Sequence, residues 1–383
     1  MKTRTRRQFL QTTALGLAAG ALRGETALDA VQAPGGTPAG AHIIDCHAHW
    51  VGPTVVRLLG TRTSPRPPQG AGWTDIDARL REMDKAGVTR QVLGWVGASF
   101  DGALSAADAK PLWRGQNDDV AAVAKKYPAR FSGLASLPTA NVTWAAEELD
   151  RAHTDLGLIG AVLPLDAFVS LAGARALAPI FDVAERHHSH IFVHRGAASP
   201  EIPGQHLEGA VNPYFGLADA GSGRGGGRGP ASSRDPGDNV QARTLLATAA
   251  HLATGVVTLA LTDFLDAYPN VSVQVAMMGG AVSYVAEHIQ MAAEEAGSPV
   301  PAKRFTRVYL DTGQSGRGPR GIAMAAKVFG ADRILFGTDS GPTTSIGPTI
   351  ESVQQAAVTA DEKALIFSGN GRRLLAAKGV SNP

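Results

Sequence analysis

Two histidines separated by a single residue close the first strongly apolar run of the sequence, Ile43-Ile44-Asp45-Cys46-His47-Ala48-His49. Side chains alternate along a strand, so the imidazoles of His47 and His49 are expected on the same side of it. Two neutral imidazoles that converge are natural ligands for a divalent metal ion, and Asp45 is placed to orient one of them. Pairs with this spacing also occur as ordinary surface histidines, so the motif alone does not establish a metal site.

Two further residues able to bind a metal ion close later apolar runs. His194 ends the run 191–194, and Asp339 ends the run 334–339. Taken singly, His194 also fits a histidine satisfied in the core, and Asp339 also fits a helix N-cap. Because strand ends of a parallel barrel meet at one rim, the residues together predict one metal centre formed by His47, His49, His194 and Asp339.

These residues need strands that carry them to a common rim. From residue 42 onward, short apolar runs alternate with amphipathic stretches, which is typical of a parallel sheet. The expected strands are residues 42–46, 90–95, 130–136, 159–163, 191–194, 271–276, 307–310 and 333–336, and expected helices include 75–86, 144–155, 174–187 and 282–296. A doubly wound open sheet shows the same alternation but needs a glycine-rich phosphate loop after its first strand, where this chain has the histidine pair. We therefore predict an α/β fold, a (β/α)8 TIM barrel.

The length of 383 residues allows one catalytic domain with additions, because such a barrel takes about 250 residues. Residues 34–41 are predicted to be a flexible linker, and residues 42–383 to be the barrel. Residues 195–240, with the glycine-rich tract 221–230, interrupt the barrel after the fifth strand. They predict a lid-like insertion at the barrel mouth, although the glycine tract fits plain disorder equally well.

Residues 1–33 have the features of an export signal. Arg6-Arg7 followed by Gln8-Phe9-Leu10 resembles the twin-arginine pattern, and the apolar stretch 15–22 is too short to span a membrane. We expect cleavage after Ala33, passage through the twin-arginine translocase as a folded protein, a periplasmic location and no stable membrane anchor. The alternative is a basic, disordered terminus.

Composition excludes two classes of protein. The formal net charge is +2, and much of the positive charge lies in the leader, so no basic field remains for nucleic acid. Cys46 is the only cysteine, so no disulfide can form within the chain. The fold must therefore be held by its core, to which a bound metal ion could add stability.

The three motifs together, residues 44–49, 192–194 and 334–339, resemble the amidohydrolase-related family, most of all its aminocarboxymuconate-semialdehyde decarboxylase group. The resemblance runs from about residue 42 to Leu375 and includes Asp311-Thr312 and the segment at Asn370. It implies one divalent ion, usually Zn2+, bound by the three histidines, with Asp339 as both ligand and proton-handling catalytic residue. No lysine ends the fourth expected strand, so the carbamylated lysine that bridges two metal ions in other amidohydrolases has no counterpart. Relatives commonly form homodimers.

The sequence departs from the family after the sixth expected strand. Relatives carry a histidine there, ahead of a Gly-Gly pair, as a general acid or base, whereas this chain has Met277-Met278-Gly279-Gly280. A thioether does not exchange protons at neutral pH, and losing one general acid or base typically removes about 10² to 10⁴ in rate. Met277 therefore marks the position of a replaced base, or a core residue if the alignment is shifted.

Other residues are candidates for supporting roles. His206, Glu208 and Asp238 in the insertion could replace the missing base, although solvated loop residues are the simpler interpretation. Arg195, beside the third histidine, is a candidate for binding a substrate carboxylate, or else part of a structural ion pair. His187, His188 and His190 precede a strand, so we expect them at the opposite face of the barrel.

The sequence therefore leaves three functions open. The first is a metal-dependent carboxy-lyase, a decarboxylase of a small unsaturated or aromatic carboxylic acid, as the resemblance implies. The second is a metal-dependent hydrolase of an amide, ester or lactone, which needs the same metal centre. The third is a non-catalytic ligand-binding barrel, in which Met277 replaces the usual histidine because no turnover is required.

Overall fold

The computed structural model describes residues 42–60, 70–97, 106–205, 239–297, 302–316, 318–341 and 346–381, together with residues 68, 104 and 299. The chain divides at Gly36 into two units, and the described residues all belong to the second, Thr37–Pro383. The expected export signal and linker lie outside the described residues, as does most of the expected insertion.

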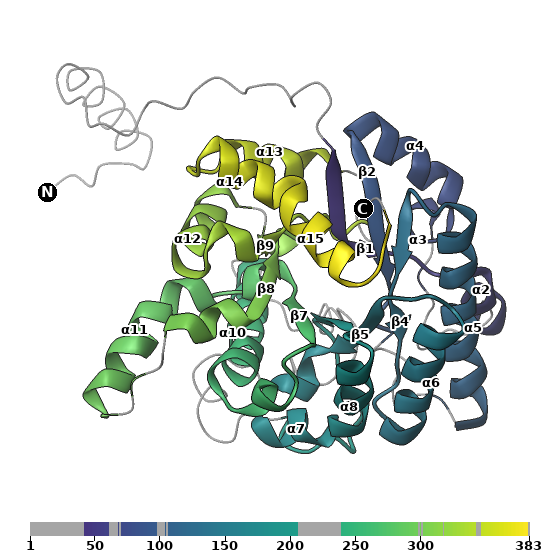
Figure 1. Cartoon of the computed structure of the whole chain (residues 1–383), viewed down its shortest axis with the longest axis horizontal. Helices are drawn as coiled ribbons and strands as arrows, with labels where there is room; N and C mark the ends of the chain where they lie inside the picture. The colour runs from purple at the N-terminus through teal and green to yellow at the C-terminus, as the bar shows by residue number, and fades with distance from the viewer. Residues whose placement is uncertain are drawn as a thin grey trace, which may run out of the picture. The chain divides into compact units, whose positions relative to one another are not determined.

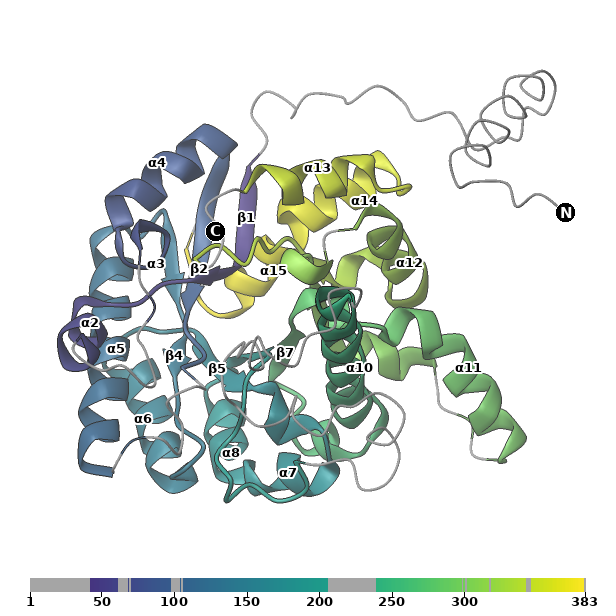
Figure 2. The same ribbon diagram turned by 180° about the vertical axis from the view of Figure 1, so that it is seen from behind.

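Parallel strands form the centre of this unit, and helices cover them from outside (Figures 1 and 2). The strands are β1 (Ile43–His49), β2 (Val88–Gly94), β3 (Phe131–Gly133), β4 (Ala135–Ser136), β5 (Gly160–Pro164), β6 (His190–His194), β7 (Ser272–Val275), β8 (Val308–Asp311) and β9 (Ile334–Leu335). They pair in chain order as β1-β2-β3 and β4-β5-β6-β7-β8-β9.

Two contacts turn these sheets into one closed barrel. Leu134 separates β3 from β4, yet its N–H donates to the carbonyl of Leu93 at 2.9 Å, so β3 and β4 are parts of one interrupted strand. The last strand returns to the first, where Ala48 bridges to Ser340 in parallel register. Counted this way, the described strands form the eight-stranded α/β barrel that the sequence predicts.

The helices of the described residues are α2 (Pro53–Leu59), α3 (Ala71–Thr74), α4 (Ile76–Ala86), α5 (Ala106–Lys126), α6 (Val142–Thr154), α7 (Leu171–Ala176), α8 (Ala178–Arg186), α10 (Val240–Leu261), α11 (Val282–Glu295), α12 (Pro319–Phe329), α13 (Gly347–Gln355), α14 (Ala360–Ala364) and α15 (Asn370–Ala377). The single helix expected over 174–187 is wrong in detail. It is two helices that meet at Leu177. Pro179 has no backbone N–H to donate, so it interrupts a continuous helix but is accepted in the first turn of α8, where the N–H groups have no partner within the helix.

Helix α10 follows the undescribed segment and is the one described helix long and apolar enough to cross a membrane by length and composition, over Ala242–Leu261. Its residues Leu252, Val256 and Leu259 are buried in the barrel's hydrophobic core. This packing accounts for the apolar side chains of its second half, whereas Leu245 and Leu246 in its first half are exposed.

The C-terminal helix α15 ties the last strand to the outer layer (Figure 1). The side-chain amide of Asn370 donates to the carbonyls of Ala331 and Ile334 at 2.8 and 2.6 Å. Gly371 lies against β1, where an added Cβ would be 3.0 Å from Ile44. The closing strands are therefore held from outside as well as through the barrel.

Candidate metal centre

Four side chains meet at the end of the barrel where the strands terminate. His47 and His49 end β1, His194 ends β6, and Asp339 follows β9. One ligand atom from each of the four lies within 4.8 Å of all the others, and all four residues are buried. The structure therefore brings together the residues that the sequence predicts as ligands.

The separations are those of ligands around a common point. The Nε2 atoms of His47 and His49 are 3.1 Å apart, and those of His49 and His194 are 3.2 Å apart. An oxygen of Asp339, Oδ1, lies 3.4 Å from Nε2 of His47 and 3.1 Å from Nε2 of His49. Three nitrogens and one carboxylate oxygen are a donor set that suits a divalent ion.

The hydrogen bonds of Nδ1 in each imidazole determine whether Nε2, the nitrogen that faces the centre, carries a proton or a lone pair. His49 Nδ1 lies 3.2 Å from the carbonyl of Gly94, and His194 Nδ1 lies 2.9 Å from the carbonyl of Arg195. A carbonyl only accepts, so each Nδ1 carries the proton and each neutral ring directs a lone pair from Nε2 toward its neighbours. Facing lone pairs repel one another unless a cation lies between them. The site therefore fits a metal ion.

Asp311, at the end of β8, orients the imidazole of His47. Its Oδ1 lies 2.9 Å from Nδ1 of His47, and the two side chains are fully buried. The expectation that Asp45 orients a ligand imidazole is wrong, since Asp45 instead accepts from the backbone of His47 and from Gln91 and Thr338. Asp45 holds the strand ends together, while Asp311 fixes the ring.

The electrostatic field at the site favours positive charge. Burial lowers the pKa of His47, but Asp311 and Asp339 outweigh it and raise the pKa to about 10. Burial raises the pKa of Asp339, and His47 and His49 outweigh that effect and hold it well below its usual range. Burial and the two neighbouring histidines lower the pKa of His194. A proton or a metal ion must offset the carboxylates, and only a metal ion uses all four ligands.

The backbone is strained at the same rim. Asp339, Met277 and Met278 all have φ between 57° and 58°, the left-handed region that residues with a side chain seldom adopt. The Asp339 N–H donates to the carbonyl of His47 at 2.9 Å, which holds the carboxylate beside the imidazoles. Such conformations persist only where surrounding contacts enforce them, and they are typical of functional sites.

Met277 lies at this rim, directly after β7. Its N–H donates to Oδ1 of Asp311 at 3.1 Å, the oxygen that also contacts the ring of His47. The side chain is 4 % exposed. One carboxylate thus links the backbone of Met277 to a predicted ligand, which agrees with the position inferred for the replaced base.

We expect Met277→Leu to leave turnover and thermal stability nearly unchanged. The two side chains have similar volume and polarity, and swaps of this kind cost less than about 1.5 kcal/mol. Turnover of the metal-loaded protein and the melting temperature are the measurements. A large fall in turnover at unchanged metal content would mean that the thioether itself takes part in the reaction.

Arg195 follows His194, and its side chain is exposed at the barrel mouth. Its positive charge acts to lower the pKa of Asp166. Trp73 stacks on His49 with ring centroids 5.8 Å apart, and Phe192 packs edge-on against His47 at 4.7 Å. Phe192 is a buried core residue, whereas Trp73 is partly exposed, so the mouth combines a cationic side chain with one aromatic surface beside the predicted ligands.

Sequence reasoning missed a second pair of polar side chains at this end of the barrel. Asp166 follows β5 in a short 3-10 helix, η1 (Leu165–Phe168), and its Oδ1 lies 3.4 Å from Nε2 of His251 on α10. Asp166 closes the apolar run 161–165, and the same rule that selected His194 and Asp339 would have selected it. His251 lies within a helix and offers no comparable signal.

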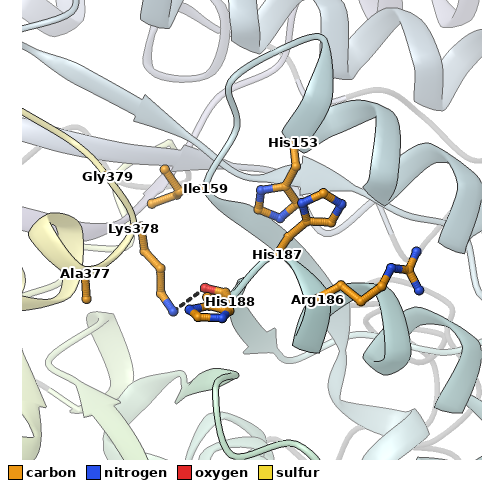
Figure 3. A pocket seen from close by; sticks show the side chains of 8 residues that line it. All are labelled: His153, Ile159, Arg186, His187, His188, Ala377, Lys378 and Gly379. Carbon is orange, nitrogen blue, oxygen red and sulfur yellow. Dashed lines mark hydrogen bonds between the residues drawn. The ribbon is translucent and has the colours of Figure 1, made fainter.

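The remaining candidates lie elsewhere. His206, Glu208 and Asp238 are outside the described residues. His190 begins β6 and His187 and His188 precede it, at the opposite end of the strand from His194. There, His153, His187, His188 and Lys378 line a cavity of about 420 Å³ (Figure 3).

The part of the chain that forms the barrel is similar to known proteins. Residues 44–376 match the protein family described as Amidohydrolase. The chain is 32% identical over 120 residues to 2-amino-3-carboxymuconate-6-semialdehyde decarboxylase of Dictyostelium discoideum. That alignment spans 31% of this chain and 33% of the relative, so the chain matches about a third of the length of this curated protein.

Solved structures of similar fold cover nearly the whole barrel. The 5-carboxyvanillate decarboxylase of Sphingomonas paucimobilis has a TM-score of 0.64 at 19% identity, over 88% of this chain and 99% of that one. A dihydroxybenzoic acid decarboxylase from Polaromonas sp. JS666, solved with manganese and the inhibitor 2-nitroresorcinol, has a TM-score of 0.63 at 21% identity, over 88% and 97%. At these identities the likeness is one of fold.

Proposed function

The chain belongs to the amidohydrolase family, and from this membership we propose that it is a metal-dependent decarboxylase of small unsaturated or aromatic carboxylic acids. The observation that carries the proposal is the convergence of nitrogens from three imidazoles and the Asp339 carboxylate at the barrel mouth. Active sites of this fold are built at that end of the strands.

The choice of decarboxylation over hydrolysis rests on the relatives. The curated relative and both solved structures described above carry the names of decarboxylases, of a carboxymuconate semialdehyde, of 5-carboxyvanillate and of a dihydroxybenzoic acid. The exposed guanidinium of Arg195 and the partly exposed ring of Trp73 suit a flat, anionic substrate.

In the proposed reaction, a metal ion held by His47, His49, His194 and Asp339 would draw electron density from a substrate oxygen. Arg195 binds the carboxylate of the substrate and sets its orientation over the barrel mouth. The partly exposed ring of Trp73 excludes water from one side, so that the carboxylate loses solvation as it enters. The bond to carbon dioxide then breaks, and a proton must reach the carbon that it leaves.

We propose one divalent ion per chain and take Zn2+ as the first candidate, because three imidazoles and one carboxylate suit it. Manganese is the alternative, since it is present in the similar dihydroxybenzoic acid decarboxylase. Elemental analysis of the purified protein, followed by activity after reconstitution with each ion, distinguishes them.

The test of the function is a screen of carboxylic acids and lactones with the metal-loaded protein. Hydroxylated benzoates come first, because a ring hydroxyl can hold the developing charge. Release of carbon dioxide with loss of the carboxyl group supports the proposal. Acid release without carbon dioxide would indicate a hydrolase, and bound metal without any turnover would indicate a binding protein.

We expect Arg195→Lys to raise the KM for the carboxylate substrate and to change kcat much less. Lysine keeps the charge but loses the two-pronged geometry of the guanidinium. Steady-state kinetics on one substrate measure both constants, and metal content serves as the control because the His194 contact uses the backbone carbonyl of residue 195. An unchanged KM would exclude Arg195 from binding the carboxylate.

We also propose that the protein is exported through the twin-arginine pathway and functions in the periplasm. Replacing Arg6 and Arg7 together by lysine is expected to leave unprocessed precursor in the cytoplasm, since the translocase reads the arginine pair. Cell fractionation followed by detection of the two forms measures this. Normal delivery of that variant to the periplasm would contradict the proposal.

A further inference from the structure

Asp166 and His251 form a carboxyl–imidazole pair outside the ligand set. Asp166 lies in η1, directly after β5, and His251 lies on α10, which packs against η1. The distance from Oδ1 of Asp166 to Nε2 of His251 is 3.4 Å. The two residues come from elements far apart in the sequence, so the fold itself creates the pair.

The pair lies one strand away from a predicted metal ligand. Pro164, the last residue of β5, is the ladder partner of His194, the last residue of β6. Two residues further on, the N–H of Asp166 donates to the carbonyl of Gly196 at 3.2 Å. The segments after the two strands therefore continue side by side, about one strand spacing of 4.8 Å apart, on the rim that carries the metal centre.

The two side chains differ in their access to water. The Asp166 side chain is 8% exposed, whereas that of His251 is 29% exposed. Burial raises the pKa of Asp166 to about 7, although Arg195 acts to lower it. Burial, and then Arg195, lowers the pKa of His251. The buried carboxyl can thus hold a proton at neutral pH, and the imidazole connects it to solvent.

Few other charges act on this carboxyl within the described residues. Helix α7, which also packs against η1, contributes one titratable side chain, Arg175, and that guanidinium is paired with Asp263 at 3.0 Å. Helix α10 carries one further titratable side chain besides His251, the exposed Arg243. Arg195 is the charged group that acts on the pKa of Asp166, and His251 is the imidazole in contact with it.

The proposed decarboxylation needs such a proton source. By the resemblance, Met277 stands where the family carries a histidine, and Asp339 belongs to the group of four residues that would hold the metal ion. We propose that Asp166 is the general acid of this reaction and that His251 returns a proton to it from solvent. This inference rests on the proposed function and assigns the residue that supplies the proton in the proposed reaction.

The bond between the substrate carbon and its carboxylate breaks, and carbon dioxide leaves without the bonding electron pair. That pair, retained on the substrate, takes the proton from the Asp166 carboxyl, which forms the new C–H bond and leaves Asp166 as a carboxylate. His251 then passes a proton from water to Asp166, and the carboxyl is restored for the next turnover.

Asp166→Asn and His251→Gln test the inference. Asparagine keeps the shape and neutrality of the protonated carboxyl but has no acidic proton, so kcat should fall by about 10² to 10⁴ at unchanged metal content. The acid works only when protonated, so wild-type kcat should be highest below about pH 7 and fall as the pH rises through it. In Asp166→Asn this fall should disappear. His251→Gln should slow turnover and keep the pH dependence.

The matched control is Asp150→Asn, which breaks an Asp–His pair of the same chemistry at the other end of the barrel. There, Oδ1 of Asp150 lies 2.8 Å from Nε2 of His187, one of the residues that line the cavity in Figure 3. This variant should keep wild-type kcat and pH dependence.

A second readout does not depend on turnover. Infrared difference spectra recorded on either side of pH 7 should show a protonated carboxyl that is lost on deprotonation in the wild type and is absent from Asp166→Asn. If the wild type decarboxylates nothing, the proposed function fails while these spectra still test the proton-exchanging pair. The inference is overturned if the carboxyl signal survives in Asp166→Asn, or if an active wild type and Asp166→Asn share one kcat and one pH profile.

Discussion

A protein in which His47 and His49 are both replaced by alanine is expected to lose its metal ion and all decarboxylase activity. The change removes two of the four ligand atoms that lie within 4.8 Å of one another. Only His194 and Asp339 then remain, and two ligands do not retain a divalent ion against dialysis. Metal content by elemental analysis should fall from about one ion per chain to nearly none.

The matched control for this variant is the double replacement of His153 and His187 by glutamine. These two imidazoles are also neighbours, stacked with centroids 4.7 Å apart, but they lie at the other end of the barrel (Figure 3). Removal of this pair should leave the metal content unchanged. Full metal content in the His47→Ala, His49→Ala protein would refute the assignment of the ligands.

Asp311→Asn is expected to weaken metal binding by about 10- to 100-fold, the usual effect of removing a group that orients a ligand histidine. Asp311 accepts on Oδ1 from His47, from the N–H of Met277 and from the N–H of Gly313, and on Oδ2 from Gln274 at 2.6 Å. An asparagine has one accepting oxygen, so its amide group must face a donor in either orientation.

Two outcomes should accompany the weaker binding. The unsatisfied buried donor should lower the free energy of unfolding by about 1 to 3 kcal/mol. The remaining activity should rise when more metal is supplied, because the four ligands are intact. The dissociation constant by competition with a chelator and the stability by denaturant titration measure the two effects. An unchanged metal affinity would show that the contact between Asp311 and His47 does not prepare the ring for coordination.

The sequence by itself was sufficient to predict the fold class and the ligand set. Each ligand closes an apolar run, and in a parallel barrel the ends of all such runs meet at one rim. His47, His49, His194 and Asp339 could therefore be selected without coordinates, and the structure brings them together. Rules of this kind depend on local periodicity, which a single sequence displays directly.

The periodicity of apolar residues predicted the extent of two elements less accurately. The run 174–187 has the periodicity of one helix, yet Pro179 makes it two, α7 and α8. The run 130–136 was expected as one strand, and the ladder is interrupted at Leu134. Both differences are interruptions inside an expected element, and hydrophobic periodicity does not register the backbone N–H that Pro179 lacks or a single residue that leaves the strand ladder.

Only the tertiary structure decided how the predicted centre is completed. Asp311, not the adjacent Asp45, orients His47 across 264 residues of sequence, and Asp166 meets His251 between a strand end and a helix far along the chain. A hydrogen bond between such distant residues leaves no periodic trace, because each partner's neighbours satisfy their own local preferences whether or not the contact exists. The ligand set was therefore open to prediction from sequence, whereas the protonation of those ligands depends on the closed barrel.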